Sequence, residues 1–279
     1  MSTPNDRAPG TSPHSAPGEP VIPFVNWGGM QALYVKEVRR FFKVQLQTVW
    51  APAFTSLLLL VVFTVALGSG KRMVLGHPFA DFIAPGMIIM AMMNAAFAHS
   101  SFTFLAGKMQ GTIVDYLMPP ISNLELMVAL VGSAVTRALC VGLAVWGVMA
   151  LLPGVHVTVR EPLAVLWFGL MGSLLLAFLG TLTSIWADKF DHAAAITNFI
   201  VQPMSLLSGT FYSVDALHGA FRTASHLNPF FYVISGFRYG FLGTSDSPLM
   251  TGALALLGVN LVLGFLCYRL LVSGWKLRA

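Results

Sequence analysis

The sequence predicts an all-α integral membrane protein with six transmembrane helices, an N-terminal amphipathic interfacial helix, and an outer helical excursion, re-entrant or interfacial, before the last span. The 279 residues are 56% hydrophobic and 10% charged, with a mean hydropathy of +0.75, whereas soluble domains carry about 25% charged residues. Several apolar stretches also reach the roughly 20 residues that cross a bilayer. The net charge of +5 is thinly spread, so no nucleic-acid partner is expected.

Residues 1–25 are predicted to form a disordered cytoplasmic tail, and residues 26–279 a single transmembrane domain. The tail is rich in Pro, Ser, Gly and Thr and contains no apolar run, so it cannot bury a core. It also lacks the apolar stretch of a secretory signal peptide, and the N-terminus is therefore expected in the cytoplasm.

An amphipathic helix is predicted at residues 26–43. Its apolar residues recur at spacings of three and four, and charged residues fill the opposite side, which suits a helix lying among lipid headgroups. A soluble helix packed on a partner is the alternative. The charged residues are Lys36, Glu37, Arg39, Arg40 and Lys43.

Six apolar segments follow that could each cross the membrane. The fifth is the weakest because it is short and carries Asn198, Gln202 and Pro203. The positive-inside rule places ten of the 16 Lys and Arg residues on the inner side, five on the outer side and Arg137 inside a span, so both termini are expected in the cytoplasm. The spans are predicted at about residues 46–68, 82–105, 124–152, 163–186, 190–210 and 249–272.

The inner loop between the second and third spans contains a short predicted helix at residues 113–118. The Thr112 hydroxyl can cap its start, and Pro119 and Pro120 prevent its continuation. A short, rigidly ended helix with an exposed apolar side is suited to docking on a partner, and an ordinary interfacial loop is the alternative. The apolar side would consist of Ile113, Tyr116 and Leu117.

The outer stretch before the last span contains a second short helix. Asn228 followed by Pro229 is a typical helix start, and the helix to residue 242 reaches only about 21 Å, too short to span. It would dip into the outer leaflet or pack on the bundle, with its aromatic side chains at headgroup depth. Gly236 and Gly240 fit the small-xxx-small pattern of close helix contacts.

Polar side chains also fall inside predicted spans. Such groups either line a transport path or form hydrogen bonds between helices, and the sequence leaves both open. The residues are Asn94, Ser101, Arg137, Asn198 and Gln202.

Known catalytic patterns are missing from the chain. It contains no phosphate-binding loop, no metalloprotease motif and no nucleophile elbow. Carboxylates fall near the span ends, which disfavours an ion-coupled carrier. We therefore expect no cofactor or metal on this chain, and an energy source on another chain if cargo moves uphill.

Taken together, the order of these parts resembles the permease subunit of an ABC-2 type ATP-binding-cassette exporter. The subgroup it is most similar to is that of the small bacterial permeases related to drug, polysaccharide and nodulation-factor exporters. The stretches that carry the resemblance are Ala84-Pro85-Gly86-Met87, Gly111-Thr112-Ile113 with Asp115 and Pro119-Pro120-Ile121-Ser122, Leu207-Ser208-Gly209-Thr210-Phe211-Tyr212, and Asn228-Pro229 with Phe237-Arg238-Tyr239-Gly240.

The resemblance implies a homodimer of permeases in a bacterial inner membrane, surrounded by lipid, with two separate ABC ATPase subunits that bind ATP and Mg. It implies a coupling helix that contacts the ATPase, formed by Gly111, Thr112, Ile113, Asp115, Tyr116, Leu117, Pro119 and Pro120. It also implies a connecting helix that carries Lys36, Glu37, Arg39 and Arg40. The outer gate region would comprise Phe211, Tyr212, Asn228, Pro229, Arg238 and Tyr239.

Two other functions compete with this one. The chain could be a channel or secondary carrier that works without an ATPase. It could also be a membrane-embedded enzyme, although no catalytic constellation supports this. The sequence does not identify the cargo.

Overall fold

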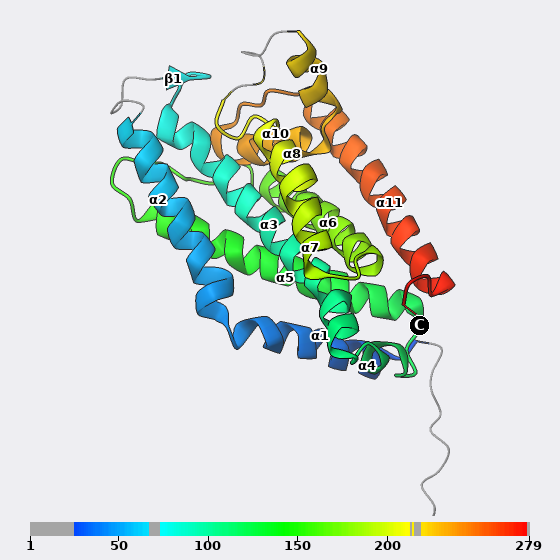
Figure 1. Ribbon diagram of the computed structural model, residues 1–279. Coiled ribbons are helices and arrows are strands. Elements are labelled where there is room, and N and C mark those ends of the chain that lie inside the picture. Colours follow the sequence, from blue (N-terminus) through cyan, green and yellow to red (C-terminus); the bar gives the residue numbers. More distant parts are fainter. Residues whose placement is uncertain (1–24, 67–72, 213, 215–218, 278–279) are drawn as a thin grey trace, which may run out of the picture.

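The computed structural model describes residues 25–66, 73–212, 214 and 219–277 (Figure 1). The predicted tail lies outside this part of the chain, except for Val25. Long helices run side by side and form a bundle, and α1 (Trp27–Phe42) lies across one end of it. Asn26 caps α1 by accepting a hydrogen bond from the Gly29 amide at 2.9 Å. The chain is thus an all-α membrane protein with an amphipathic N-terminal helix.

Among the described residues, five helices are long and apolar enough to cross a membrane. In the first of them, a π-helical turn, η1 (Leu46–Trp50), leads directly into α2. Helix α3 lies in the middle of the bundle, where it packs against α2, α5, α6 and α10. The long helices are α2 (Ala51–Ala66), α3 (Phe79–Gln110), α5 (Asn123–Ala150), α6 (Pro162–Trp186) and α11 (Leu249–Ser273).

The segment predicted as the fifth span is divided into short helices. These are α7 (Phe190–Ile196), η2 (Thr197–Val201) and α8 (Gln202–Leu206). The helical path ends at Leu206, four residues before the predicted end of the span at about residue 210. Both π-helical turns, η1 and η2, end two residues before a proline, Pro52 and Pro203. A proline has no N–H to donate, and a π-turn is one way for the helix to adjust its hydrogen bonds.

The chain nevertheless passes between the two ends of the bundle at this point. The Lys276 ammonium contacts the Trp186 carbonyl at 3.0 Å at the α1 end, whereas the Asn228 amide contacts the Met204 carbonyl at the opposite end. Near the α1 end, Leu33 and Leu277 belong to one apolar cluster, so both described ends of the chain lie together. Because the described chain begins and ends at the same end of the bundle, it runs along the bundle an even number of times. Six membrane spans remain a prediction.

The end opposite α1 carries several smaller elements. A two-stranded antiparallel pair, β1 (Met73–Val74) and β2 (His77–Pro78), precedes α3. Further along the chain, α9 (Ala220–Leu227) leads into α10 (Pro229–Leu242).

Helix α10 packs inside the bundle, against α6, α3 and α11. Asn228 caps it by accepting from the Phe230 amide at 3.0 Å, as predicted. A Cβ atom on Gly236 would lie 2.3 Å from the Phe168 ring, which confirms the predicted close helix contact. Phe230 and Phe237 are buried in the core, in line with packing on the bundle, while the headgroup depth of the aromatic side chains stays a prediction.

Candidate coupling site and membrane groove

A single helical turn, α4 (Val114–Leu117), follows α3 at the α1 end. Gly111 ends α3 in the left-handed conformation, at φ +71°, which favours glycine. The predicted hydroxyl cap of Thr112 is wrong: Ile113 holds the cap position, and Thr112 contributes its backbone carbonyl to the Asp115 amide at 3.1 Å. The bends at residues 118–120 follow, consistent with the two prolines.

The turn points Tyr116 into the protein and its other apolar side chains outward. Tyr116 is buried, which corrects the prediction that it forms part of an exposed apolar side. In a helix, residues three and four apart share a face, so Val114, Leu117 and Met118 are exposed together on the opposite side of α4. Asp115, Pro119 and Pro120 are also exposed.

The partner of Tyr116 is Glu37 on α1. The Tyr116 hydroxyl donates to Glu37 Oε1 at 3.0 Å. The prediction that Glu37 lies on the polar face of α1 is wrong: its side chain is fully buried, in line with Leu33 and Phe41. Burying a carboxylate is costly unless it is paired, and Arg40 supplies the pairing at 2.7 Å.

Burial and the neighbouring Glu37 carboxylate raise the pKa of Tyr116 to about 12. A phenol with this pKa stays protonated across the physiological range. Its hydroxyl is therefore available as the hydrogen-bond donor to Glu37 at neutral pH.

The same cluster reaches the membrane helices. Arg40 donates to the Thr103 hydroxyl on α3 at 3.2 Å. His99, one turn before Thr103, contacts Ser133 of α5 at 3.0 Å and lies 3.7 Å from Glu37. Elements α1, α3, α4 and α5 thus meet at one set of mostly buried polar side chains. We call this set the Glu37 cluster; it consists of Glu37, Arg40, His99, Thr103, Tyr116 and Ser133.

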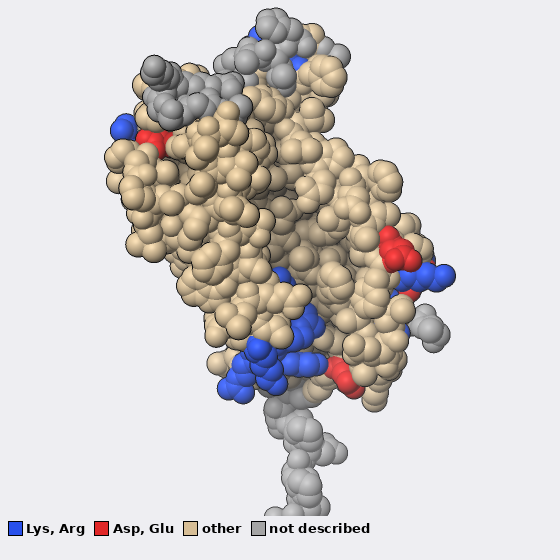
Figure 2. All heavy atoms as spheres, turned by 60° about the vertical axis from the view of Figure 1, so that its left-hand side comes forward, with Lys and Arg blue, Asp and Glu red and all other residues tan. Residues whose placement is uncertain are grey.

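The other two charged residues of α1, Lys36 and Arg39, are not part of the Glu37 cluster. Lys36 and Arg39 are exposed, and the Lys36 ammonium lies 4.3 Å above the Tyr116 ring. Lys and Arg side chains gather at this end of the molecule, while the face above them is hollowed along its middle (Figure 2).

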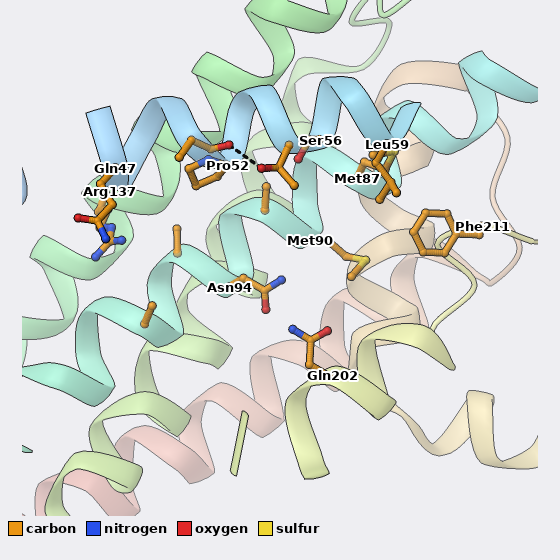
Figure 3. A pocket seen from close by; sticks show the side chains of 15 residues that line it. Gln47, Pro52, Ser56, Leu59, Met87, Met90, Asn94, Arg137, Gln202 and Phe211 are labelled. Carbon is orange, nitrogen blue, oxygen red and sulfur yellow. Dashed lines mark hydrogen bonds between the residues drawn. The ribbon is translucent and has the colours of Figure 1, made fainter. Parts of the chain in front are cut away.

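A cavity of about 600 Å³ opens on this side, between α2 and α8. Gln47 and Arg137 lie at one end of it, Phe211 at the other, and Asn94 and Gln202 between them (Figure 3). Much of its wall is apolar, with Leu59, Met87 and Met90 among the lining residues.

Two neighbouring cavities share residues with the first. One of about 520 Å³ has Asn94 and Gln202 in common with it, and the other of about 310 Å³ has Arg137 in common. We call the three together the lateral groove. It brings together all five polar residues singled out in the sequence, which are Asn94, Ser101, Arg137, Asn198 and Gln202.

These five side chains do not join helices to one another. Ser101 donates to the Ala98 carbonyl of its own helix at 3.3 Å. Within the described residues no hydrogen bond links any of the five to another helix, and the buried Nε of Arg137 has no acceptor there. The arrangement therefore favours a groove lining over interhelical hydrogen bonding.

The predicted outer gate residues do not converge on one site. Phe211 lines the groove, whereas the Tyr212 hydroxyl donates to the Leu206 carbonyl at 3.0 Å. Asn228 and Pro229 form the start of α10, and Tyr239 is half-buried on it.

Arg238 is buried completely and ion-paired with Asp246 at 3.0 Å. It also donates to the Phe82 carbonyl at 3.2 Å and the Gly209 carbonyl at 2.8 Å. This side chain joins α10, the start of α3 and the segment after α8. Asp246 was missed in the sequence, because nothing in its loop indicates a buried partner eight residues away.

A comparison with protein families decides what kind of protein this is. The family model of the ABC-2 type transporter matches residues 29–242. The chain belongs to the ABC-2 type transporter family. The match extends from α1 to the end of α10, so it includes the Glu37 cluster, α4 and the lateral groove.

Curated proteins with similar sequences agree with this membership. The ABC-2 chain is 32% identical over 255 residues to the inner membrane transport permease YadH of Escherichia coli K12, covering 91% of this chain and 98% of that protein. It is 26% identical over 197 residues to nodulation protein J of Rhizobium leguminosarum bv. viciae, covering 66% and 72%. Nodulation protein J of Rhizobium meliloti is 25% identical over 212 residues, covering 74% and 76%.

The ABC-2 chain is therefore a membrane component of a transporter. Its described residues contain no group of three or more His, Cys, Asp and Glu side chains that could hold a metal ion. Two features of its described residues stand out: an exposed helical turn joined to the bundle by the Glu37 cluster, and a groove lined by polar side chains of long apolar helices.

Proposed function

We propose that this chain is the permease subunit of an ATP-driven exporter, and that it is coupled to a separate ATPase subunit through α4. The proposal rests on the fact that α4 has one exposed apolar side and one buried side. Val114, Leu117 and Met118 are exposed at the end of the bundle, while Tyr116 joins the same turn to Glu37 of α1. A partner that pushes α4 would therefore also move α1 and, through Arg40, α3.

The chain has no phosphate-binding loop of its own. ATP and Mg would accordingly be bound by the partner ATPase, and this chain would supply the path and the docking surface. Coupling of this kind needs an element that can occupy two positions. The short helices α7, η2 and α8 beside the groove are candidates, because each has few residues to hold it in place.

We place the α1 and α4 end of the bundle in the cytoplasm, together with both termini. Positively charged residues favour the cytoplasmic side of a membrane protein. Four Lys and Arg residues lie in α1 or directly after it. One more lies in α3 and another near the end of the chain. They are Lys36, Arg39, Arg40, Lys43, Lys108 and Lys276.

We further propose that two copies of the chain pair across the lateral groove. The groove is open on the side of α2 and η2, where Phe54 is 59% and Phe199 is 81% exposed. A second copy placed there would turn two open grooves into one enclosed path. The name of the relative YadH supports an inner membrane location for such an assembly.

Pairing can be tested by cysteine cross-linking in native membranes. In a background where Cys140 and Cys267 are replaced by serine, Phe199→Cys should give a cross-linked dimer. Val262→Cys, at a similarly exposed position on α11, is the control and should stay monomeric. Dimer formation through Val262→Cys alone would show that the copies meet elsewhere.

The ATPase partnership is tested by co-purification. The chain is co-expressed with a phosphate-loop ATPase encoded beside its gene, and the amount of ATPase retained is measured. The Met118→Glu variant should no longer co-purify with the ATPase, because the substitution places a charge on the exposed apolar side of α4. Trp275→Glu changes another exposed apolar residue at the same end of the molecule, and should retain it. If Met118→Glu retains the ATPase fully, the coupling surface is not α4.

The alternative is a channel or secondary carrier that needs no ATPase. The purified chain, reconstituted alone, would then move cargo across vesicles. Transport by the chain alone would favour this alternative and contradict the proposal.

A further inference from the structure

Arg137 places a positive charge at the centre of a membrane helix, and no ion pair joins it to another described residue. It lies 14 residues after the start of α5 at Asn123, which is about 21 Å along the helix axis. Its Nε is buried and has no acceptor among the described residues. A guanidinium at such depth is costly unless it faces a partner or a water-filled cavity.

The described surroundings of Arg137 offer no carboxylate that could neutralise it. No described Asp or Glu lines either of the two cavities that Arg137 shares. Arg40 lines the smaller of them, but its charge is paired with Glu37, so the unbalanced positive charge belongs to Arg137. The nearby Glu37 is committed to Arg40 and Tyr116. This part of the groove is therefore electropositive.

The rest of the larger cavity has a different character. From Arg137 it runs past Asn94 and Gln202 to Phe211 (Figure 3). Met87 and Met90 make its wall apolar along the way. Its volume of about 600 Å³ lies in the range of about 300–1,000 Å³ that is typical of small-molecule sites.

We infer that the groove binds an amphipathic anion, whose acidic headgroup contacts Arg137 and whose apolar part lies along Met87, Met90 and Phe211. An arginine binds phosphate or carboxylate through parallel N–H donors, which makes these headgroups its preferred partners. The inference rests on the proposed function, in that it names the class of cargo for the proposed path. It concerns binding only and requires no ATPase.

The test is a fluorescence titration of the purified full chain in phosphatidylcholine nanodiscs. The probes are lysophosphatidic acid and lysophosphatidylcholine that carry the same fluorophore, so that they differ in headgroup charge. The acid should bind about tenfold to a hundredfold more tightly, as expected for a charge-assisted hydrogen bond. Equal affinities for the two probes would overturn the inference.

Variants then locate the headgroup. Arg137→Gln should remove the preference for the acid, and Arg137→Lys should retain part of it. Arg269→Gln, an equal change of charge at an exposed position of α11, should leave the preference intact. An undiminished preference in Arg137→Gln would overturn the inference.

A thermal measurement separates anion binding from a structural role of Arg137. Ligand-free Arg137→Gln should unfold at the wild-type temperature or above, because the substitution removes an unpaired charge. A clear decrease would mean that Arg137 has a structural partner and would overturn the inference.

Adding phosphatidylglycerol to the nanodiscs distinguishes the sources of the anion. Competition with the fluorescent acid would assign the site to bilayer lipid, and lack of competition would assign it to single-chain amphiphiles. Either result supports an anion site.

A failure here is distinguishable from a failure of the proposed function. Loss of the headgroup preference leaves ATPase co-purification untouched. Failure to recruit an ATPase, in turn, leaves the binding titration unchanged.

Discussion

The Tyr116 hydroxyl on α4 donates a hydrogen bond of 3.0 Å to the fully buried carboxylate of Glu37 on α1. Both elements lie at the end of the bundle where the described chain begins and ends (Figure 1). Arg40 extends this contact to Thr103 of α3 at 3.2 Å. Because these groups are linked in series, α4 cannot shift far without moving α1 or breaking a buried hydrogen bond. A displacement of the exposed turn α4 would therefore be transmitted to α1 and α3.

Removing the Tyr116 hydroxyl should loosen this linkage. We expect Tyr116→Phe to fold but to be less stable by about 1–3 kcal/mol, the usual effect of leaving a buried acceptor without its donor. Thermal unfolding in one detergent measures the change. Tyr268→Phe, which alters a more exposed tyrosine on α11, is the control. Equal unfolding temperatures for Tyr116→Phe and wild type would show that this hydrogen bond does not stabilise the protein.

The same contact predicts an effect at alkaline pH. Burial and the Glu37 charge raise the pKa of Tyr116 to about 12, from about 10 for an unperturbed tyrosine. The folded state therefore favours the neutral phenol. This stabilisation is fully present below about pH 10 and is lost as the pH rises through about 12.

Ultraviolet absorbance of tyrosinate checks this prediction. The difference between the titration curves of wild type and Tyr116→Phe should have its midpoint near 12. A midpoint near that of an unperturbed tyrosine, about 10, would show that Tyr116 is not held by Glu37.

Close packing of α10 on α6 should make Gly236 intolerant of a methyl group. A Cβ atom there would lie 2.3 Å from the Phe168 ring, so Gly236→Ala is expected to destabilise the protein by about 1–3 kcal/mol through overpacking. Gly258→Ala on α11 meets no atom within 4 Å and should be neutral or slightly stabilising. Thermal unfolding of both variants tests this. The packing account fails if the two behave alike.

The buried pair of Arg238 and Asp246 should be sensitive to loss of its negative partner. Both side chains are 1% exposed, so Asp246→Asn leaves a buried guanidinium without its counter-charge. The expected loss of stability is about 3–5 kcal/mol. Asp191→Asn at an exposed position should change the unfolding temperature little. Comparable small shifts in both variants would contradict the role of the pair.

The long apolar helices were predictable because length and hydropathy are local properties of the chain. Helix α10 was predicted at residues 229–242 from its Asn-Pro start, and the structure places it at Pro229–Leu242. Its burial was left open, since a sequence cannot show which neighbours cover a helix. The division of the fifth segment at Thr197–Val201 was also missed, although Pro203 indicated a weak span.

The polar contacts were less predictable. Glu37 sits among basic residues, so its periodicity indicated the solvent side of α1, and only a tertiary partner, Tyr116, explains its burial. The gathering of Asn94, Arg137 and Gln202 in one cavity likewise depends on how three separate segments pack. Sequence reasoning identified these residues as unusual but left their shared location open.

The most direct test of the central claim is photo-cross-linking from α4 in the co-expressed assembly. A benzophenone amino acid replaces Met118, which is 77% exposed, or, as a control, Met250, which is 72% exposed at the start of α11. The account predicts a covalent adduct between this chain and the ATPase from position 118 and none from position 250. It is contradicted if position 118 gives no adduct, or if both positions give the same one.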